Sequence, residues 1–239
     1  MREPLNQPNP KHRYVNNMFD RIAKRYDLMN TLMTAGLHRR WRRKAIELAA
    51  PPKGGLSLDV GCGTGDLTVE LSLHQPQAVI GIDFSVPMVT IGQHKITNMN
   101  ISPLPSLGIG DALNLPFPDE TFDTVATAFT LRNLTDYSAG IQEMRRVTRR
   151  GGKFVCIEIC PWNNGFLSWA FHLMFKILVP LLGIVFGRDR QAYKYLPSSV
   201  SQFLQANQIT ALLEESGFSD VKYERLAMGA VAIHVGTAD

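Results

Sequence analysis

The sequence contains few cysteines, and they form neither pairs nor a metal-ligand motif. Cys62, Cys156 and Cys160 are an odd set in a chain of 239 residues. A disulfide scaffold needs an even and denser set, and a zinc site needs closely spaced ligands. We therefore expect reduced thiols, with Cys62 filling a turn and the other two in the core. We also expect no metal ion and a cytoplasmic location.

The N-terminus lacks the apolar stretch of a secretory signal, and the chain lacks repeats and low-complexity tracts. Residues 1–13 contain three prolines and mostly polar side chains, which predicts a flexible arm and not a signal peptide. Hydrophobic residues make up 45% and charged residues 19% of the sequence, as in ordinary folded proteins. A length of 239 residues favours one elaborated domain over two small ones.

The positive charge is confined to the N-terminal region. Residues 1–50 hold 11 of the 25 basic residues but only 4 of the 21 acidic ones, so they carry +7 while the remainder carries −3. The basic stretch 39–44 predicts contact with an acidic surface, either an anionic membrane or a nucleic acid. Nucleic acid is disfavoured because the sequence shows no pattern of interleaved aromatic and basic residues on which bases could stack. A solvated helix face is the plain alternative.

Apolar periodicity predicts helices first and a βαβ arrangement afterwards. Helical spacing relates Met18, Ile22, Tyr26, Met29 and Met33. Residues 14–50 therefore predict a helical cap. Beyond it, short apolar runs alternate with helical segments, which is typical of a parallel sheet. The seven predicted strands cover 56–60, 79–83, 105–110, 123–129, 152–160, 221–226 and 230–236. A helix over 207–216 is expected to end before Gly217.

One segment is unusually apolar. Residues 166–187 contain a single formal charge, Lys176, and are long enough to cross a membrane. A crossing would place strands of one sheet on opposite sides of a bilayer, and Pro180 interrupts the helix, so a span is disfavoured. We interpret residues 161–190 as an apolar insertion. It forms either a pair of core helices or, as the favoured interpretation, a surface that handles lipid.

The strongest motif is a strand that runs into alternate glycines. Residues 58–66, LDVGCGTGD, place Gly61, Gly63 and Gly65 at a strand-to-helix turn. Such glycines let the backbone turn sharply and approach a ligand. A dinucleotide fingerprint would have its third glycine at position 66, where this chain has Asp66. A carboxylate there repels phosphate and favours a cationic ligand such as S-adenosylmethionine.

Two further acids follow neighbouring strands. Asp83 ends the next strand, where its two carboxylate oxygens suit the two hydroxyls of a ribose. Asp111, followed by Ala112, comes after the third strand, where we expect it to accept from an adenine amino group. Because strand ends converge on one crevice in open α/β sheets, these acids and the glycine turn predict one adenosylmethionine site.

These motifs resemble those of the class I methyltransferases, and three stretches narrow the resemblance to the ubiquinone/menaquinone biosynthesis C-methyltransferases. They are FDRIAKRYDLMN at 19–30, GLHRRW at 36–41 and FTLRNLTD at 129–136. The resemblance implies a Rossmann-like class I methyltransferase fold over 51–239, with a seven-stranded, mostly parallel sheet and a reversed last strand. The expected cofactor-binding residues are Asp59, Gly61, Gly63, Thr64, Gly65, Asp83, Asp111 and Ala112.

The resemblance also implies the reaction. We expect transfer of a methyl group from S-adenosylmethionine to a ring carbon of a prenylated quinol, with demethylmenaquinol converted to menaquinol in the last step of menaquinone biosynthesis. A polyprenyl benzoquinol in ubiquinone biosynthesis and a phytyl naphthoquinol are the alternatives. A cofactor-binding scaffold without catalysis is an alternative of another class. The expected partners are the quinol and a membrane surface, and a homodimer stays open.

A quinol carbon attacks the methyl group readily only when a phenolic proton is removed. Four residues are candidates for helping to remove it. They are Arg132, Asn133, His38 and Tyr26. Arg132 is expected to stabilise a phenolate, with an ion pair to Asp136 or Asp123 as the structural alternative. His38 titrates in the useful range, although the neighbouring arginines would lower its pKa. Tyr26 either lines the cleft or belongs to the apolar helix face.

Overall fold

The computed structural model describes residues 10–161, 183 and 189–239. The apolar segment 166–187 lies outside the described residues except for Gly183, as do residues 1–9 of the predicted arm. No helix in the described part of the chain is long and apolar enough to cross a membrane. The described α-helices are α1 (Pro10–Ile22), α2 (Tyr26–Thr34), α3 (Leu37–Ala49), α4 (Asp66–Ser72), α5 (Val86–Thr97), α6 (Tyr137–Val147), α8 (Arg190–Ser201) and α9 (Ala206–Glu215).

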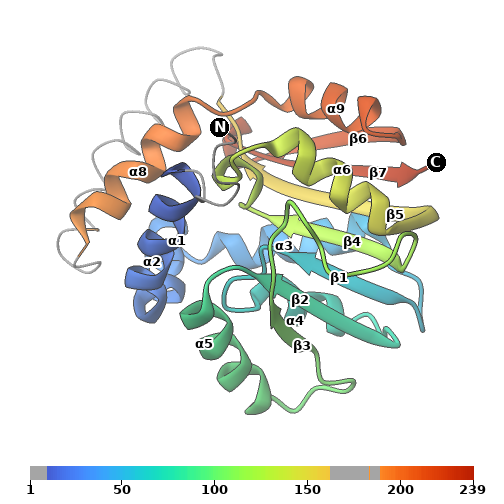
Figure 1. Ribbon diagram of the computed structural model, residues 1–239, viewed down its shortest axis with the longest axis horizontal. Coiled ribbons are helices and arrows are strands. Elements are labelled where there is room, and N and C mark those ends of the chain that lie inside the picture. Colours follow the sequence, from blue (N-terminus) through green and yellow to red (C-terminus); the bar gives the residue numbers. More distant parts are fainter. Residues whose placement is uncertain (1–9, 162–182, 184–188) are drawn as a thin grey trace, which may run out of the picture.

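Seven strands form one sheet in the order β3-β2-β1-β4-β5-β7-β6, as Figure 1 shows. The strands are β1 (Leu56–Val60), β2 (Ala78–Asp83), β3 (Ser106–Ile109), β4 (Phe122–Ala128), β5 (Thr148–Ile159), β6 (Phe218–Leu226) and β7 (Val231–Ala238). The first five pair in parallel, and β7 runs antiparallel to both of its neighbours, β5 and β6. The predicted seven-stranded, mostly parallel sheet with a reversed last strand is confirmed.

Two strands begin three or more residues earlier than the sequence pattern predicts. β5 starts at Thr148 instead of residue 152, and it pairs with β4 across an irregularity that the glycines at 151 and 152 accommodate. β6 starts at Phe218 instead of residue 221, with a register shift around Asp220, whose φ is +50°. Turn-like residues inside a strand interrupt the alternation of apolar and polar side chains, so the pattern does not reveal where the strand begins.

Helices cover both faces of the sheet because its strands alternate apolar side chains between two cores. One core joins α3 and α4 to the sheet through residues such as Ile46, Leu71 and Val155. The other joins α6 and α9 to the opposite face and includes Phe154 and the predicted core thiols Cys156 and Cys160. Successive residues of β5 therefore serve opposite cores, as the pleat of a strand requires.

The helices before β1 differ from the periodic pattern in two ways. α1 begins at Pro10, so residues 10–13 are helical and do not belong to a flexible arm. The apolar stripe also spans two helices, because a short 3₁₀ turn at Ala23–Arg25 separates α1 from α2. Met18, Ile22 and Met29 are buried in a third core with residues of α8.

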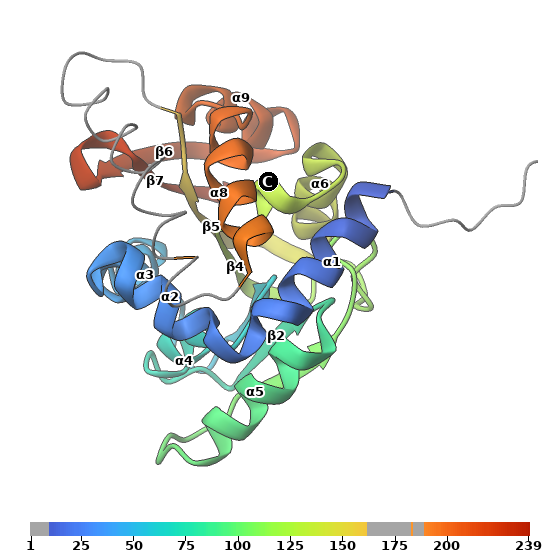
Figure 2. The ribbon, with the colours of Figure 1, turned by 90° about the vertical axis from the view of Figure 1, so that its left-hand side faces the viewer.

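The cap lies beyond the carboxyl ends of the parallel strands. Figure 2 looks at this end of the molecule, where α1, α2 and α8 lie toward the viewer. There α3 is seen nearly end-on at the left, because it runs back along one face of the sheet. A charged cluster joins the cap to the glycine loop: the Thr64 hydroxyl donates to Asp27 Oδ1 at 2.5 Å, and Lys95 Nζ contacts Asp27 Oδ2 at 3.1 Å and Asp66 Oδ1 at 2.8 Å. Helices distant in sequence from the glycine motif thereby enclose it.

The turn after β1 depends on the missing side chain at Gly61. Its φ is +73°, and a Cβ built there would lie 2.3 Å from Cγ2 and Oγ1 of Thr130. The Thr130 hydroxyl in turn lies within hydrogen-bonding distance of the carbonyl oxygens of Val60 and Gly61. Glycine is therefore required both for the left-handed backbone and for the close approach of the loop after β4.

We expect Gly61→Ala to destabilise the protein more than Gly54→Ala does. Gly54 has nearly the same φ, +72°, but open space around its missing Cβ. The left-handed backbone alone costs about 1–2 kcal/mol, and displacement of Thr130 adds about 1–3 kcal/mol at Gly61 only. Urea denaturation of both variants measures the difference in unfolding free energy. Equal losses would contradict the packing argument.

Candidate functional site

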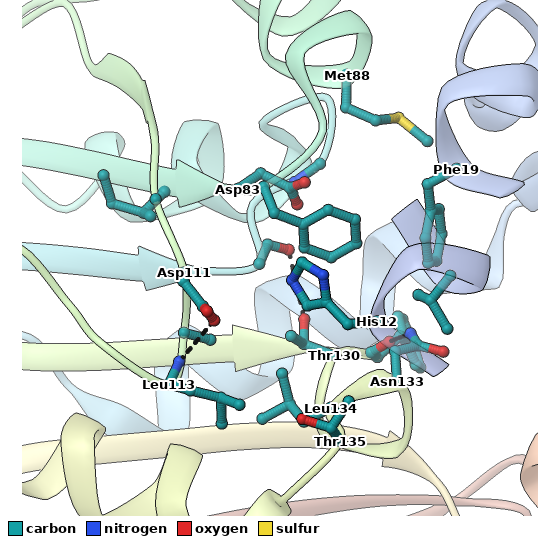
Figure 3. Close-up of a pocket in the computed structure, with 18 of the residues that line it drawn as sticks. His12, Phe19, Asp83, Met88, Asp111, Leu113, Thr130, Asn133, Leu134 and Thr135 are labelled. Atoms are coloured by element: carbon teal, nitrogen blue, oxygen red, sulfur yellow. Dashed lines mark hydrogen bonds between the residues drawn. The ribbon is translucent and has the colours of Figure 1, made fainter. Parts of the chain in front are cut away.

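Three adjoining cavities lie where the parallel strands meet the cap. The first, which we call the strand-end cavity, has a volume of about 740 Å³. In Figure 3 Asp83 and Asp111 lie on the strand side, while His12 and Phe19 reach in from α1. Gly61, Gly63 and Ala112 also line this cavity. Five of the eight expected cofactor residues therefore come together here, from the ends of three strands.

Asp83 is held by the backbone on both sides of its carboxylate. Its Oδ2 accepts from the Gly63 N–H at 2.8 Å and its Oδ1 from the Ser85 N–H at 2.9 Å. Burial raises the pKa of this carboxyl, and these backbone donors oppose the rise. Each oxygen keeps a further lone pair, so the fixed carboxylate can accept from two neighbouring hydroxyls of a ribose.

Asp111 and Ala112 close the far end of the strand-end cavity. Asp111 is exposed, and its Oδ1 accepts from the Leu113 N–H at 2.9 Å (Figure 3). Ala112 is buried. A polar acceptor beside a small apolar residue suits the edge and the face of an adenine ring. Thr64 and Gly65 do not line the strand-end cavity. Thr64, whose hydroxyl is bonded to the cap, lines the small polar cavity described next, and Gly65, the residue before α4, lines none of the three cavities.

A second, small polar cavity of about 260 Å³ opens on the other side of Gly61. Asp59 lies at its base, 1% exposed. Its Oδ2 accepts from the Thr68 hydroxyl at 2.6 Å, whereas its Oδ1 has no hydrogen-bond partner. Burial raises the pKa of this carboxyl to about 7. The orphaned oxygen fits S-adenosylmethionine, because the ammonium of that molecule is a donor of the required charge.

Asp66 does not have the role expected from the motif. Its carboxylate lies 2.8 Å from Lys95 Nζ and 3.5 Å from Arg42 Nη1, and these cations hold its pKa below the usual range despite burial. The negative charge is therefore balanced within the chain and is not left for a ligand. The sequence could not reveal this, because Lys95 and Arg42 come from helices on either side of the motif.

The third cavity, which we call the aromatic cavity, has a volume of about 820 Å³ and lies between the cap and α8. Apolar and aromatic side chains supply most of its wall, with polar groups at a few points. It is lined by Met18, Phe19, Ile22, Tyr26, Met29, Asn30, Met33, Thr34, His38, Trp41, Arg42, Phe129, Arg132, Asn133, Ile159, Ala192, Tyr193, Tyr195 and Leu196. Such a lining suits a flat, largely apolar molecule with few polar groups.

Arg132 projects into the aromatic cavity from a buried ion pair. Its Nη1 donates to Glu158 Oε2 at 2.7 Å, and the two side chains are 8% and 0% exposed. The sequence-based alternative named the wrong acids, because Asp123 pairs with Arg149 at 2.8 Å and Asp136 caps α6. Burial raises the pKa of Glu158, while the guanidinium opposes the rise. The pair therefore fixes Arg132 at the cavity wall.

Phe129 separates the strand-end cavity from the aromatic cavity and lines both. Its φ of +61° is unusual for a bulky residue. Its N–H donates to the Ile157 carbonyl oxygen at 2.7 Å. The guanidinium carbons of Arg42 and Arg132 lie 5.6 and 5.7 Å from the ring centroid, within range of a cation–π contact. A strained backbone held this firmly at a cavity wall is typical of a functional site.

The other proton-handling candidates also line the aromatic cavity. The Asn133 amide donates to the Phe129 carbonyl oxygen at 3.0 Å and accepts from the Tyr195 hydroxyl at 3.3 Å. His38 is buried beside Thr34, with 2.8 Å between Nδ1 and the hydroxyl oxygen. Burial and the Arg42 charge lower the pKa of His38 to about 4, so its ring is neutral at neutral pH.

Tyr26 lies where the three cavities meet. Among the described residues, it alone lines all three. Desolvation raises the pKa of its phenol, which therefore stays protonated at neutral pH. The periodic pattern placed Tyr26 either in the cleft or on the apolar helix face. Its ring lies in both, since it lines the cavities and also packs against the core that contains Met18 and Met29.

Sequence reasoning missed Glu158, Phe129 and Arg42 as functional residues. One signal was available for Glu158, because a lone acid inside the apolar run FVCIEIC demands a buried partner. Arg42 was grouped with the exposed basic stretch 39–44, yet its side chain is only 7% exposed. Helical spacing from His38 to the buried face of α3 at Ala45 and Ala49 would have placed it inward.

The chain is similar in sequence to known proteins over nearly its whole length. Residues 7–238 match the ubiE/COQ5 methyltransferase family. A demethylmenaquinone methyltransferase from Roseiflexus castenholzii is 43% identical over 233 residues, covering 97% of this chain and 96% of that protein. The demethylmenaquinone methyltransferase of Bacillus subtilis is 36% identical over 229 residues, covering 95% and 97%.

Solved structures resemble the fold at low sequence identity. A SAM-dependent methyltransferase from Thermotoga maritima, described as a possible histamine N-methyltransferase, aligns with a TM-score of 0.68 at 18% identity and covers 94% of this chain and 100% of that one. The [4+2]-cyclase SpnF aligns with a TM-score of 0.72 at 17% identity, covering 98% and 99%. These two support the fold alone, and the expected class I methyltransferase fold is confirmed. The match over nearly the whole length shows that the chain belongs to the ubiE/COQ5 methyltransferase family.

Proposed function

We propose that the protein transfers a methyl group from S-adenosylmethionine to a ring carbon of demethylmenaquinol, giving menaquinol in the last step of menaquinone biosynthesis. The observation that carries the proposal is the aromatic cavity, which adjoins the acid-lined strand-end cavity at Tyr26. The names of relatives that are 36–43% identical over nearly the whole chain support the same reaction.

The acids of the site match the parts of the methyl donor. Asp83 suits the ribose hydroxyls, Asp111 the adenine amino group and Asp59 the ammonium. When bound, S-adenosylmethionine supplies an electrophilic methyl group on a sulfonium. The glycine loop brings backbone close to that region, and α1 with His12 and Phe19 shields it from water (Figure 3).

The aromatic cavity suits a quinol better than a polar acceptor. A flat naphthalene ring and an isoprenoid tail are apolar, and the wall offers Trp41, Tyr193 and the methionines of the cap. Only the reduced ring is nucleophilic, since its phenolic oxygens push electron density onto the neighbouring carbon. The enzyme must therefore favour loss of a phenolic proton while it keeps the ring in line with the methyl group.

The four proton-handling candidates differ in charge, and we assign each a different part in loss of the phenolic proton. Arg132 remains cationic and lies at the cavity wall, so it stabilises a developing phenolate. Asn133 orients the acceptor through its amide, and the protonated Tyr26 donates at the junction of the cavities. His38, which is neutral, accepts a hydrogen bond from a quinol hydroxyl.

A benzoquinol or a phytyl naphthoquinol would undergo the same chemistry, so both stay as alternatives. A non-catalytic scaffold is disfavoured, because the cofactor acids and the Arg132–Glu158 pair are present together. The expected homodimer stays a prediction.

A turnover assay tests the proposed function. Methyl-labelled S-adenosylmethionine is offered with demethylmenaquinol, with a polyprenyl benzoquinol and with the oxidised form of each, and products are analysed by mass spectrometry. We expect label on the reduced naphthoquinol alone, because the oxidised ring is not a nucleophile. Label on the benzoquinol alone would replace the proposed acceptor, and label on neither would favour the scaffold.

We expect Arg132 to act on turnover and not on cofactor binding. Removing the arginine alone would leave Glu158 buried without a cation, which costs about 3–5 kcal/mol of stability. The double variant Arg132→Met/Glu158→Met removes the pair together and avoids that penalty. Its kcat should fall by about 100-fold or more, as when one oxyanion donor is lost, while the affinity for S-adenosylhomocysteine stays within about twofold. A wild-type kcat would exclude the catalytic role.

We also propose that the cap contacts an anionic membrane, because a quinol with a long isoprenoid tail resides in a bilayer. Leu28 and Leu32, one helical turn apart on α2, are 51% and 38% exposed, and Leu37 at the start of α3 is 41% exposed. Exposed basic residues of the stretch 39–44 follow directly. Exposed apolar side chains beside arginines suit the boundary between acyl chains and anionic headgroups.

The triple variant Arg39→Gln/Arg40→Gln/Arg43→Gln should bind vesicles of phosphatidylglycerol and phosphatidylcholine more weakly than the wild type. Each basic residue near such a surface contributes about 1 kcal/mol, so the partition coefficient should fall by about 10- to 100-fold at low salt. Cosedimentation measures it. Arg149→Gln/Arg150→Gln, at the opposite ends of the strands, is the control and should leave binding unchanged. Equal binding by all three proteins would contradict the docking surface.

A further inference from the structure

The polar cavity contains two buried groups of opposite charge that do not pair with each other. Asp59 is 1% exposed and its Oδ1 has no hydrogen-bond partner. The Arg42 side chain is 7% exposed, and its Nε and Nη1 likewise have no hydrogen-bond partner. Leaving such groups unsatisfied costs several kcal/mol in general, so both point to a ligand that carries both charges.

The neighbours of Arg42 do not satisfy its guanidinium. Asp66 lies 3.5 Å away, an ion pair without a hydrogen bond, and its carboxylate is already bonded to Lys95 at 2.8 Å. The ring of Phe129 lies 5.6 Å from the guanidinium carbon and stacks without offering an acceptor of comparable strength. The N–H groups of Arg42 are thus held in place with donor capacity to spare.

The position of the polar cavity identifies the part of the cofactor that reaches it. It shares Gly61, Tyr26 and Ala128 with the strand-end cavity, so the two adjoin at the glycine turn. With adenine and ribose at Asp111 and Asp83, the remaining end of S-adenosylmethionine extends in this direction. That end is an α-amino acid, with an ammonium and a carboxylate on the same carbon.

We propose that Arg42 binds the carboxylate of the amino-acid end of S-adenosylmethionine, while Asp59 accepts from its ammonium. The planar guanidinium matches a carboxylate with two parallel donors, which a lysine could not do. One arginine of the basic stretch 39–44 thus belongs to the cofactor site, whereas Arg39, Arg40 and Arg43 remain on the surface. The assignment rests on the proposed use of S-adenosylmethionine.

Calorimetric titration with three stable probes tests the assignment. S-adenosylhomocysteine has both the ammonium and the carboxylate, its decarboxylated analogue keeps the ammonium alone, and 5′-methylthioadenosine has neither. Arg42→Met, which retains much of the apolar stem, should weaken S-adenosylhomocysteine binding by about tenfold or more, equal to about 1.4 kcal/mol. Binding of the other two probes should change by less than about twofold.

Two further variants keep the test decisive. Arg43→Met removes a charge from the same helix at a side chain that is 63% exposed, and it should leave all three affinities unchanged. Arg42→Lys retains the buried cation and should give a smaller, carboxylate-specific loss. This variant provides the test if Arg42→Met does not fold.

The outcomes separate this assignment from the proposed function. A wild-type protein that binds none of the three probes would overturn the use of S-adenosylmethionine itself. Strong binding by the wild type, with equal losses for all three probes in the Arg42 variants, would overturn the carboxylate contact alone. Unchanged S-adenosylhomocysteine affinity with a raised KM for the quinol would also overturn it, because Arg42 would then act in the aromatic cavity.

Discussion

The close approach of two loops at Gly61 determines where the rest of the site lies. Because no side chain fills this position, the Thr130 loop packs directly on the turn after β1. The same turn sends the Gly63 N–H to Asp83 and leaves Asp59 beneath it. The strand-end cavity and the polar cavity both open around this point, and Tyr26 from the cap connects them to the aromatic cavity. The geometry of the reaction centre is thus set mainly by backbone packing.

The two buried arginines beside the Phe129 ring, Arg132 and Arg42, differ in how far their hydrogen bonds are satisfied. Arg132 is hydrogen-bonded to Glu158, which fixes its orientation in the interior. Arg42 has only its 3.5 Å ion pair with Asp66, and its Nε and Nη1, like Asp59 Oδ1, have no hydrogen-bond partner. The hydrogen-bonded pair rigidifies a wall of the aromatic cavity, whereas the unsatisfied atoms of Arg42 and Asp59 are available to a ligand. Natural structures retain unsatisfied buried groups mainly at such places, because elsewhere their desolvation cost has no compensation.

The fold alone does not decide the chemistry, since a methyltransferase and a [4+2]-cyclase both align with this chain. What distinguishes this protein is the wall of the aromatic cavity, which comes mostly from the cap and α8. The loop after β4 and the end of β5 complete it with Phe129, Arg132, Asn133 and Ile159. In the proposed function, the strand ends provide an adenosine site, which the fold can offer to several reactions. The added helices would then select a flat, apolar acceptor and exclude water from it.

The resemblance to a known family predicted the reversed last strand. The sequence by itself determined the seven strands, the glycine turn and the acids at the strand ends. These follow from local patterns, because strand period, turn residues and motif spacing are properties of contiguous residues. The tertiary structure decided which charges meet. Glu158 pairs with Arg132, and Lys95 pairs with Asp66. Arg42 points inward and lines the same cavity as Asp59. Those partners come from elements far apart in the chain, so only the packing of helices on the sheet brings them together.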